Sequence, residues 1–139
     1  MDQPIGFSLS SIATEQFAII EQNFSENNEV FISTTLRFGK HDEDKEIAVS
    51  ALFKFEIESQ PFILIEGACR FKIEPASWGT FVKDDKMIIP KGFLTHLAIL
   101  TIGTVRGILH AKTENTSFNH FVIPTIDVTE IITEDYTFG

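Results

Sequence analysis

The stretch that decides the fold runs from Ile47 to Ile57 and reads IAVSALFKFEI. Apolar side chains occupy every second position of this stretch, and Ser50, Lys54 and Glu56 stand between them. Because successive side chains of a strand point to opposite faces, the pattern predicts a strand with one buried and one wetter face. We expect the odd-numbered residues of this strand to face a hydrophobic core.

Two neighbouring stretches repeat this period of two. Residues 30–38 alternate before a turn at residues 41–45, and residues 63–73 alternate after a break at residues 59–61. Short connections between such strands predict antiparallel neighbours that share one hydrophobic face. The shared phase predicts burial beneath helices for Ile47, Val49, Phe53, Phe55, Ile63, Ile65, Phe71 and Ile73.

The segment from Ile5 to Phe24 is apolar but less regular. Its alternation slips at Ser10 and Ser11. A slip moves every later side chain to the opposite face unless a bulge absorbs the extra residue. We interpret the segment as a long first strand, bulged or bent, that runs to about Phe24. A helix over residues 14–22 is the alternative.

The pattern changes after the fourth strand. Residues 74–86 contain proline and glycine and have no period, which predicts a long loop. From Pro90 to Leu109 the apolar residues recur at helical spacing, and proline suits a first helical turn. We therefore expect one long helix in this part of the chain.

The last part of the chain predicts a second, shorter helix. A polar loop at residues 112–119 and an extended segment at residues 121–124 come first. Asp127 is then followed three residues later by Glu130, which is the arrangement of a helix N-terminus. The apolar residues beyond it predict a short last helix that runs to Tyr136.

The charge of the chain limits its partners. The 139 residues include 20 acidic and 11 basic ones, for a net charge of −9. Such a surface repels phosphates, so we expect no nucleic-acid partner. The acidity either keeps the protein soluble or forms a docking face for a basic partner.

The sequence also indicates where the protein is found. The first residues are acidic and polar rather than a secretory leader, so we expect a cytoplasmic protein. Polar residues interrupt the apolar run 93–109, so we expect no membrane insertion.

No constellation in the sequence predicts catalysis. There is no glycine-rich phosphate loop, and His41 lies in an acidic turn. His96 and His110 lack partners at metal-ligand spacing, apart from Glu114 four residues after His110. Cys69 lies on the apolar face of a strand, where a thiol is usually inert. We expect no enzyme, no metal and no cofactor.

The order of these elements resembles that of the SecB family of export chaperones. Four short motifs carry the resemblance, which covers residues 7–132. They are FSL at residues 7–9, CRFKI at 69–73, RGIL at 106–109 and IPTID at 123–127.

The resemblance implies an α+β fold, with a four-stranded antiparallel sheet and a long and a short helix packed on one face. It implies a single SecB-like domain over residues 1–139, assembled into a homotetramer as a dimer of dimers. The implied function is ATP-independent holding of unfolded or export-bound polypeptides. The implied partner beside these clients is the translocase motor SecA or another basic protein.

The candidate polypeptide-binding residues come from a surplus of phenylalanine. There are 14 phenylalanines among 139 residues, more than the core of a domain of this size is expected to absorb. We therefore predict a partly exposed apolar surface for clients, formed by Phe62, Trp78, Phe81, Phe121 and Ile131. The alternative is a small-ligand or structural binding domain whose aromatic residues line a pocket between sheet and helix.

A docking face for a basic partner requires acidic residues on the outward side of the sheet. Four residues are the candidates for that role: Glu21, Glu56, Glu58 and Glu66. If these carboxylates share one face, partner binding is expected to weaken as salt rises.

Overall fold

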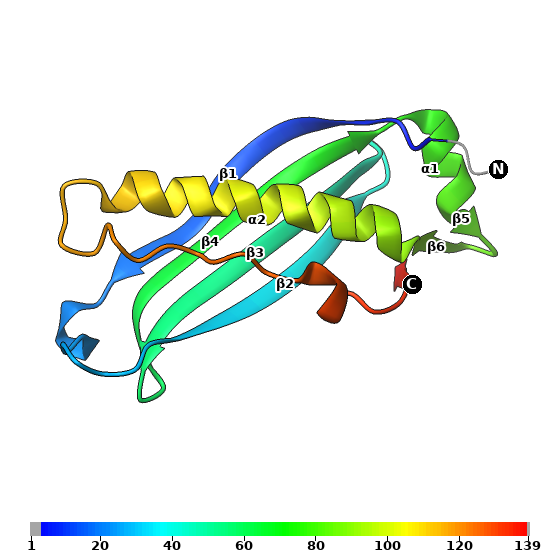
Figure 1. Ribbon diagram of the computed structural model, residues 1–139. Helices are drawn as coiled ribbons and strands as arrows, with labels where there is room; N and C mark the ends of the chain where they lie inside the picture. Colours follow the sequence, from blue (N-terminus) through cyan, green and yellow to red (C-terminus); the bar gives the residue numbers. More distant parts are fainter. Residues whose placement is uncertain (1–3, 139) are drawn as a thin grey trace.

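The computed structural model describes residues 4–138 and is built around one antiparallel sheet (Figure 1). The four long strands lie in the order β1-β4-β3-β2. Their bounds are β1 Phe7–Ile19, β2 Phe31–His41, β3 Glu46–Ile57 and β4 Gln60–Ile73. The edges of the sheet are therefore the first and the second strand of the chain.

The hydrophobic core lies on one side of this sheet. All eight residues whose burial the strand phases predict are at most 1% exposed, which confirms the prediction. β3 pairs with β4 so that Val49 lies opposite Cys69 and Phe53 opposite Ile65. Residues directly opposite each other share a face, so the two central strands present one continuous apolar surface.

The long helix α2, Lys91–Thr113, crosses this apolar face above β4 and β3 (Figure 1). It approaches β4 closely at Gly67, where an added Cβ would lie 2.8 Å from Val105 Cγ2. α2 is long and apolar enough to cross a membrane by length and composition, as are the core helices of many globular proteins. Here one side of α2 packs on the sheet, with Leu97, Ala98 and other apolar residues buried.

The first strand contains the predicted bulge. The pairing of β1 with β4 shifts between Leu9 and Ser11, and again between Thr14 and Gln16. β1 ends at Ile19 and is followed by a short 3-10 turn, η1 Glu21–Asn23. The segment is therefore a bulged strand rather than a helix, and it ends five residues before Phe24.

The prediction of a long loop over residues 74–86 is wrong. This part of the chain contains the short helix α1, Pro75–Phe81, and a small hairpin. Pro75 stands in the first turn of α1, and Trp78 and Phe81 lie three residues apart and are buried. Two buried rings at helical spacing stabilise this helix. The sequence does not predict it, because the segment contains Gly79 and has no side-chain cap. The hairpin consists of β5 Val82–Lys83 and β6 Lys86–Ile89.

The predicted last helix is only a single 3-10 turn, η2 Val128–Glu130. Asp127 caps it as predicted, because its Oδ1 accepts a hydrogen bond from the backbone N–H of Thr129 at 3.1 Å. The chain then continues in extended form to β7, Tyr136–Phe138, which pairs with β6. The short helix of the fold is thus α1, and the predicted α+β class with a four-stranded antiparallel sheet and two helices is confirmed.

Candidate functional site

An extended segment lies beside α2 on the same face of the sheet (Figure 1). We call residues 114–135 the strap. The Arg106 side chain fixes it to α2, since its Nε and Nη2 donate hydrogen bonds to the carbonyls of Ile123 and Pro124, both at 2.8 Å. Farther along, the Asp135 carboxylate accepts a hydrogen bond from the backbone N–H of Lys91 at 2.9 Å. The strap is therefore held to α2 at two places, near its middle and at its last residue.

One cluster of rings packs the first part of the strap against the sheet. Its ring centroids lie 5.1–6.4 Å apart, and its members are Phe24, Phe55, Phe62, Phe118 and Phe121. The sequence phase places Phe62 on the opposite face of β4, yet its side chain is fully buried. The pairing of β3 with β4 shifts beside it, from Phe55 opposite Ile63 to Glu56 opposite Pro61. Phe62 is the extra residue of this bulge, which turns its ring into the core.

A second ring cluster packs at the other end of the sheet, beside α1. The Phe7 ring lies 6.0 Å from that of Phe71 and 5.4 Å from that of Phe93, and the Phe81 ring lies 5.8 Å from that of Phe93. Trp78, in α1, is 7% exposed. The phenylalanine surplus therefore fills both ends of the core.

These packings correct the predicted client surface. Phe62, Trp78 and Phe81 are buried rather than exposed, and the first lies at the opposite end of the sheet from the other two. Phe121 is half-buried against Phe62, with the ring centroids 5.1 Å apart. Only Ile131 is exposed, at 44%. The five residues do not form one surface. Their rings pack into two separate clusters of the core, one at each end of the sheet.

The structure instead forms a groove where the end of the strap faces β2. This groove has a volume of about 600 Å³. It is lined by Leu36, Phe38, Leu94, Ile131, Ile132, Thr133, Glu134, Asp135, Tyr136 and Thr137. Its floor thus comes from β2, one wall comes from the start of α2, and the other comes from the end of the strap and β7. Of the predicted client residues, only Ile131 belongs to it.

Strand β2 gives the groove a backbone edge. It pairs with β3 through all its 11 residues, and no other strand pairs with it among residues 4–138. An edge strand carries a row of unpaired N–H and C=O groups along its outer side. Ile32, Leu36 and Phe38, which face the helix side, are only half-buried. Apolar side chains and free backbone groups therefore lie next to each other.

Sequence reasoning missed most of these groove residues. The alternation of residues 30–38 shows that Leu36 and Phe38 face the apolar side of the sheet, but it does not show that β2 is an edge strand. Tyr136 was assigned to a helix, whereas it lies in β7 with its ring 5.1 Å from that of Phe38.

Two smaller hollows continue along the strap on either side of Phe121. One, of about 440 Å³, lies between this ring and the loop at residues 24–30. The other, of about 360 Å³, lies between Phe121, the exposed Val122 and Gly103 of α2. The helix-side surface is therefore indented beside the strap at several places.

The four candidate acidic residues do not form one docking face. Glu21 lies in η1 and Glu58 in the turn between β3 and β4, so both lie outside the strands. Glu56 and Glu66 do face away from α2, as their register opposite Phe31 and Leu52 shows. Glu66 is only 7% exposed, because Gln16 donates a hydrogen bond to it at 3.0 Å and Arg37 lies 3.7 Å from it.

The described residues 4–138 contain no group of three or more His, Cys, Asp or Glu side chains that could hold a metal ion. Cys69 is 1% exposed beneath α2. A buried thiol in apolar surroundings is a poor nucleophile. The absence of an enzymatic activity stays a prediction.

No family model matches the sequence, and no curated protein does. Among solved structures, the chain resembles the SecB-like chaperone Rv1957 of Mycobacterium tuberculosis, which was solved with a ChAD peptide from the Rv1956 HigA1 antitoxin. The TM-score is 0.52 at 7% sequence identity, over 87% of this chain and 91% of that one. A protein of unknown function from Streptococcus agalactiae matches with a TM-score of 0.38 at 14% identity, over 90% of this chain and 100% of that one. The bulged four-stranded sheet crossed by α2 is thus a SecB-like fold.

Proposed function

We propose that this protein is an ATP-independent holdase chaperone that binds unfolded or export-bound polypeptides in the groove between β2 and the strap. One observation carries the proposal: a groove whose floor is formed by Leu36 and Phe38 lies directly beside the edge strand β2, which among residues 4–138 pairs only with β3. Unfolded segments expose apolar side chains together with free backbone groups. A site that receives both binds them with little dependence on sequence.

The geometry favours an extended client that lies along β2. Its backbone would pair with the free edge of β2, and alternate side chains would enter the groove above Leu36 and Phe38. Ile131, in the facing wall, is 44% exposed and would cover such side chains from the strap. The polar members of the same wall, such as Thr133 and Thr137, offer hydrogen-bonding groups to polar client residues.

The fold comparison supports a polypeptide as the ligand. The SecB-like structure that this chain resembles was solved with a peptide from an antitoxin. We extend that ligand class, and not the particular peptide, to this protein. The proposed setting is the cytoplasm, where clients before export are unfolded.

The proposal includes self-association, as a dimer of dimers. Part of α2 that faces away from the sheet is apolar, with Ile99 52% and Leu100 41% exposed. Gly103 and Gly107 follow on α2, and an added Cβ at either would meet nothing within 4 Å. A smooth apolar helix face lets the helix of a second copy pack closely against it. Assembly in this way would place several grooves on one particle.

A client-aggregation assay tests the groove. A denatured model enzyme is diluted into buffer with stoichiometric amounts of protein and without ATP, and light scattering follows aggregation. Wild type is expected to suppress it. The double variant Leu36→Thr, Ile131→Ser removes apolar contacts from two sides of the groove, so it is expected to suppress aggregation poorly while it keeps the wild-type circular dichroism spectrum.

Val82→Ser is the matched control. Val82 is exposed to a similar degree, 51%, but lies in β5 outside the groove, so this variant is expected to act like wild type. A photo-crosslinker at position 131 should capture the client, and one at position 82 should not. Full activity of the groove variant contradicts the groove assignment, and no suppression by wild type contradicts the chaperone function.

A further inference from the structure

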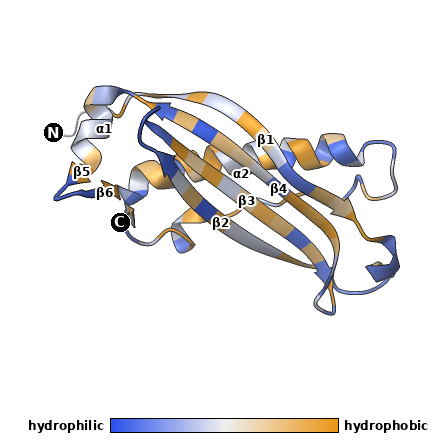
Figure 2. Cartoon of the chain, turned by 180° about the vertical axis from the view of Figure 1, so that it is seen from behind, coloured by the Kyte–Doolittle hydropathy of each residue, from blue (hydrophilic) through white to orange (hydrophobic). Residues whose placement is uncertain are grey.

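We call the side of the sheet that faces away from α2 the outer face, and no helix of residues 4–138 covers it (Figure 2). Its residues follow from the register, since residues opposite each other share a face. On β3 the odd-numbered residues are buried beneath α2, so the even-numbered ones point outward. Arg37 lies opposite Ser50, and Arg70 lies opposite Ala48, so both arginines are on the outer face.

The outer face differs in charge from the rest of the molecule. Its charged side chains are Arg37, Lys54, Arg70 and Lys72 against Glu46, Glu56 and Glu66. On β2, β3 and β4 the face thus holds four of the 11 basic residues of the chain but only three of the 20 acidic ones. It carries a slight excess of positive charge on a protein whose net charge is −9.

Two of the acidic side chains are already occupied, whereas the cations at one end are free. Glu66 is paired with Gln16 and Arg37, and Glu46 accepts a hydrogen bond from the Ser10 hydroxyl at 2.6 Å. Arg70 and Lys72 are exposed, and neither forms a side-chain ion pair within residues 4–138. Glu46 lies opposite Lys72, so these two cations outnumber the acidic side chain beside them and leave a positive charge for a partner.

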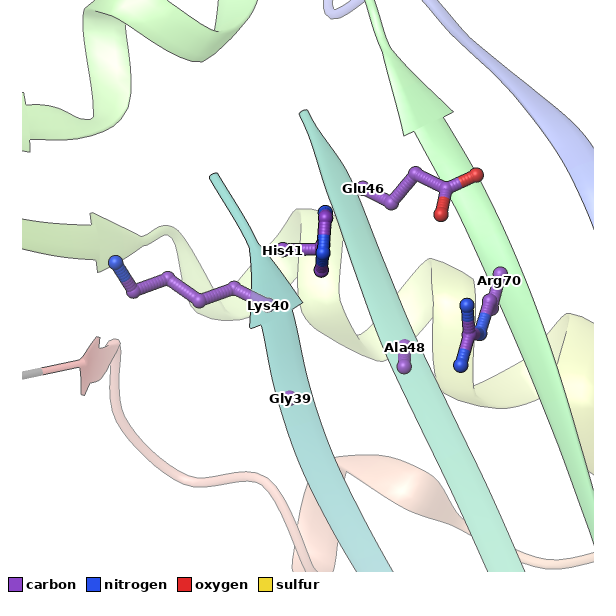
Figure 3. Close-up of a pocket in the computed structure, with 6 residues that line it drawn as sticks. All are labelled: Gly39, Lys40, His41, Glu46, Ala48 and Arg70. Carbon is purple, nitrogen blue, oxygen red and sulfur yellow. The ribbon is translucent and has the colours of Figure 1, made fainter. Parts of the chain in front are cut away.

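The surface beside Arg70 is hollow enough to receive a side chain. Gly39 and Ala48 lie opposite each other, and their small size leaves a depression of about 140 Å³. Figure 3 shows Arg70 and His41 on strands that flank Ala48, while Lys40 extends away from them. Glu46 also lines the depression, and its carboxylate accepts the hydrogen bond from the Ser10 hydroxyl. A guanidinium beside such a depression suits a carboxylate, which it binds with two parallel hydrogen bonds.

An exposed ring lies at the other end of the same face. Phe31 lies opposite Glu56 and is 58% exposed, and it is the only phenylalanine among the exposed large hydrophobic residues of the described chain. Exposed aromatic side chains are typical anchors of protein interfaces. The outer face therefore combines free cations at one end with an apolar anchor at the other.

We propose that the outer face docks an extended acidic segment of a partner protein, separately from the client groove. Carboxylates of the segment bind Arg70 and Lys72, and an apolar side chain packs on Phe31. Phe31 lies opposite Glu56, which lies opposite Pro61, so a segment that reaches from Phe31 to Lys72 is about eleven residues long, at roughly 3.3 Å per residue. This partner has the opposite charge to the basic one that the acidic composition predicts.

The charges favour this partner over two others. A symmetric contact with a second copy, centred on Arg70 and Lys72, would bring these like charges together. A nucleic acid extends beyond the face, and the net charge of −9 repels it. A short acidic segment meets only the cationic part of the surface.

Fluorescence anisotropy with labelled peptides tests the proposal. The probe is a twelve-residue peptide that alternates Glu and Thr and ends in Leu, and its control carries Lys in place of Glu. Wild type is expected to bind the acidic peptide, more weakly at 150 mM than at 20 mM salt. The variant Arg70→Gln, Lys72→Gln should bind it about tenfold more weakly, as the loss of two exposed ion pairs implies.

Lys83→Gln, Lys86→Gln is the matched control, since it removes the same charge from the β5–β6 hairpin. It is expected to bind the acidic peptide like wild type, and so is the groove variant Leu36→Thr, Ile131→Ser. The proposal is overturned if the acidic peptide does not bind wild type, or if the Lys peptide binds equally well. It is also overturned if Arg70→Gln, Lys72→Gln binds unchanged, or if oligothymidine competes for the same residues more tightly than the peptide.

Discussion

Gly67 stands on β4 where α2 crosses the sheet, and its missing side chain sets the distance between the two. An alanine Cβ there would lie 2.8 Å from Val105 Cγ2 and 3.4 Å from Ile108 Cδ1. Val105 is β-branched and fully buried, so it has little freedom to move. Gly67→Ala is therefore expected to lower the free energy of unfolding by about 1–3 kcal/mol, measured by urea denaturation.

Gly92→Ala provides the comparison, because a Cβ at Gly92 meets nothing within 4 Å. Gly92 lies in the first turn of α2, where alanine is a better helix former by up to about 1 kcal/mol. This variant is expected to be at least as stable as wild type. Equal stability of both variants would mean that α2 does not pack closely on β4.

Phe62 shows where residue patterns stop being informative. Strict alternation predicted which residues of β3, and of β4 from Ile63 onward, are buried beneath α2, because an unbroken strand has only two faces. It did not predict the burial of Leu52 and Glu66 on the other face. One extra residue opposite Phe55 and Glu56 turned Phe62 inward, and a bulge of this kind depends on the pairing with β3. The sequence contains the alternation of each strand but not the register between strands.

The strap depends on Arg106 for its attachment to α2. The two hydrogen bonds of its guanidinium hold the carbonyls of Ile123 and Pro124, and hydrogen bonds from charged groups contribute about 1.5–3 kcal/mol each. Arg106→Gln is expected to release this part of the strap. Amide hydrogen exchange should accelerate tenfold or more at Phe121, which lies two residues before Ile123 and whose N–H group donates to the Phe118 carbonyl.

Lys112→Gln removes a positive charge from the same helix without touching the strap, since Lys112 is exposed near the end of α2. Its strap amides should exchange as in wild type. In both variants the amides of β3 should stay protected. Acceleration across the whole sheet in Arg106→Gln would show global destabilisation instead of local release.

The one short helix of the fold was predicted in the wrong part of the chain, and for a physical reason. Asp127 forms the expected cap, but the residues after it form only η2 because the chain is drawn into pairing with β6 at Tyr136. Conversely, α1 has no capping side chain, and the burial of Trp78 stabilises it. Local signals identify where a helix can start, whereas tertiary packing decides whether it continues.

Self-association concerns the whole molecule and follows from the exposed apolar face of α2. Wild type is expected to scatter light with a mass near four times the 15.7 kDa of one chain. Ile99→Lys with Leu100→Lys puts two like charges on this face, so the variant is expected to dissociate while it keeps its fold, because both side chains are already exposed.

Val82→Lys is the control, since it adds a charge at an equally exposed aliphatic residue on β5. It should keep the wild-type mass. A monomeric wild type contradicts the proposed assembly, and an unchanged mass of the α2 variant contradicts the α2 contact.

At this scale the sequence predicted the fold class and missed the surfaces. Element order and strand phase suffice for an α+β sheet crossed by one long helix. The groove and the outer face depend on which residues from distant parts of the chain meet, such as Leu36 with Tyr136. The net charge likewise describes the whole chain. It does not show that Arg70 and Lys72 lie on one face of the sheet.

The two sides of the groove have a consequence for the time course of synthesis. β2 leaves the ribosome early, whereas residues 131–137 follow only after β3, β4 and α2 have been translated. At about 5–20 residues per second, this delay lasts for seconds, which is long compared with hairpin formation. The nascent sheet can therefore form while the groove still lacks a wall. A polypeptide that meets the growing chain finds the bare β2 edge, and the groove is formed only when Tyr136 packs against Phe38.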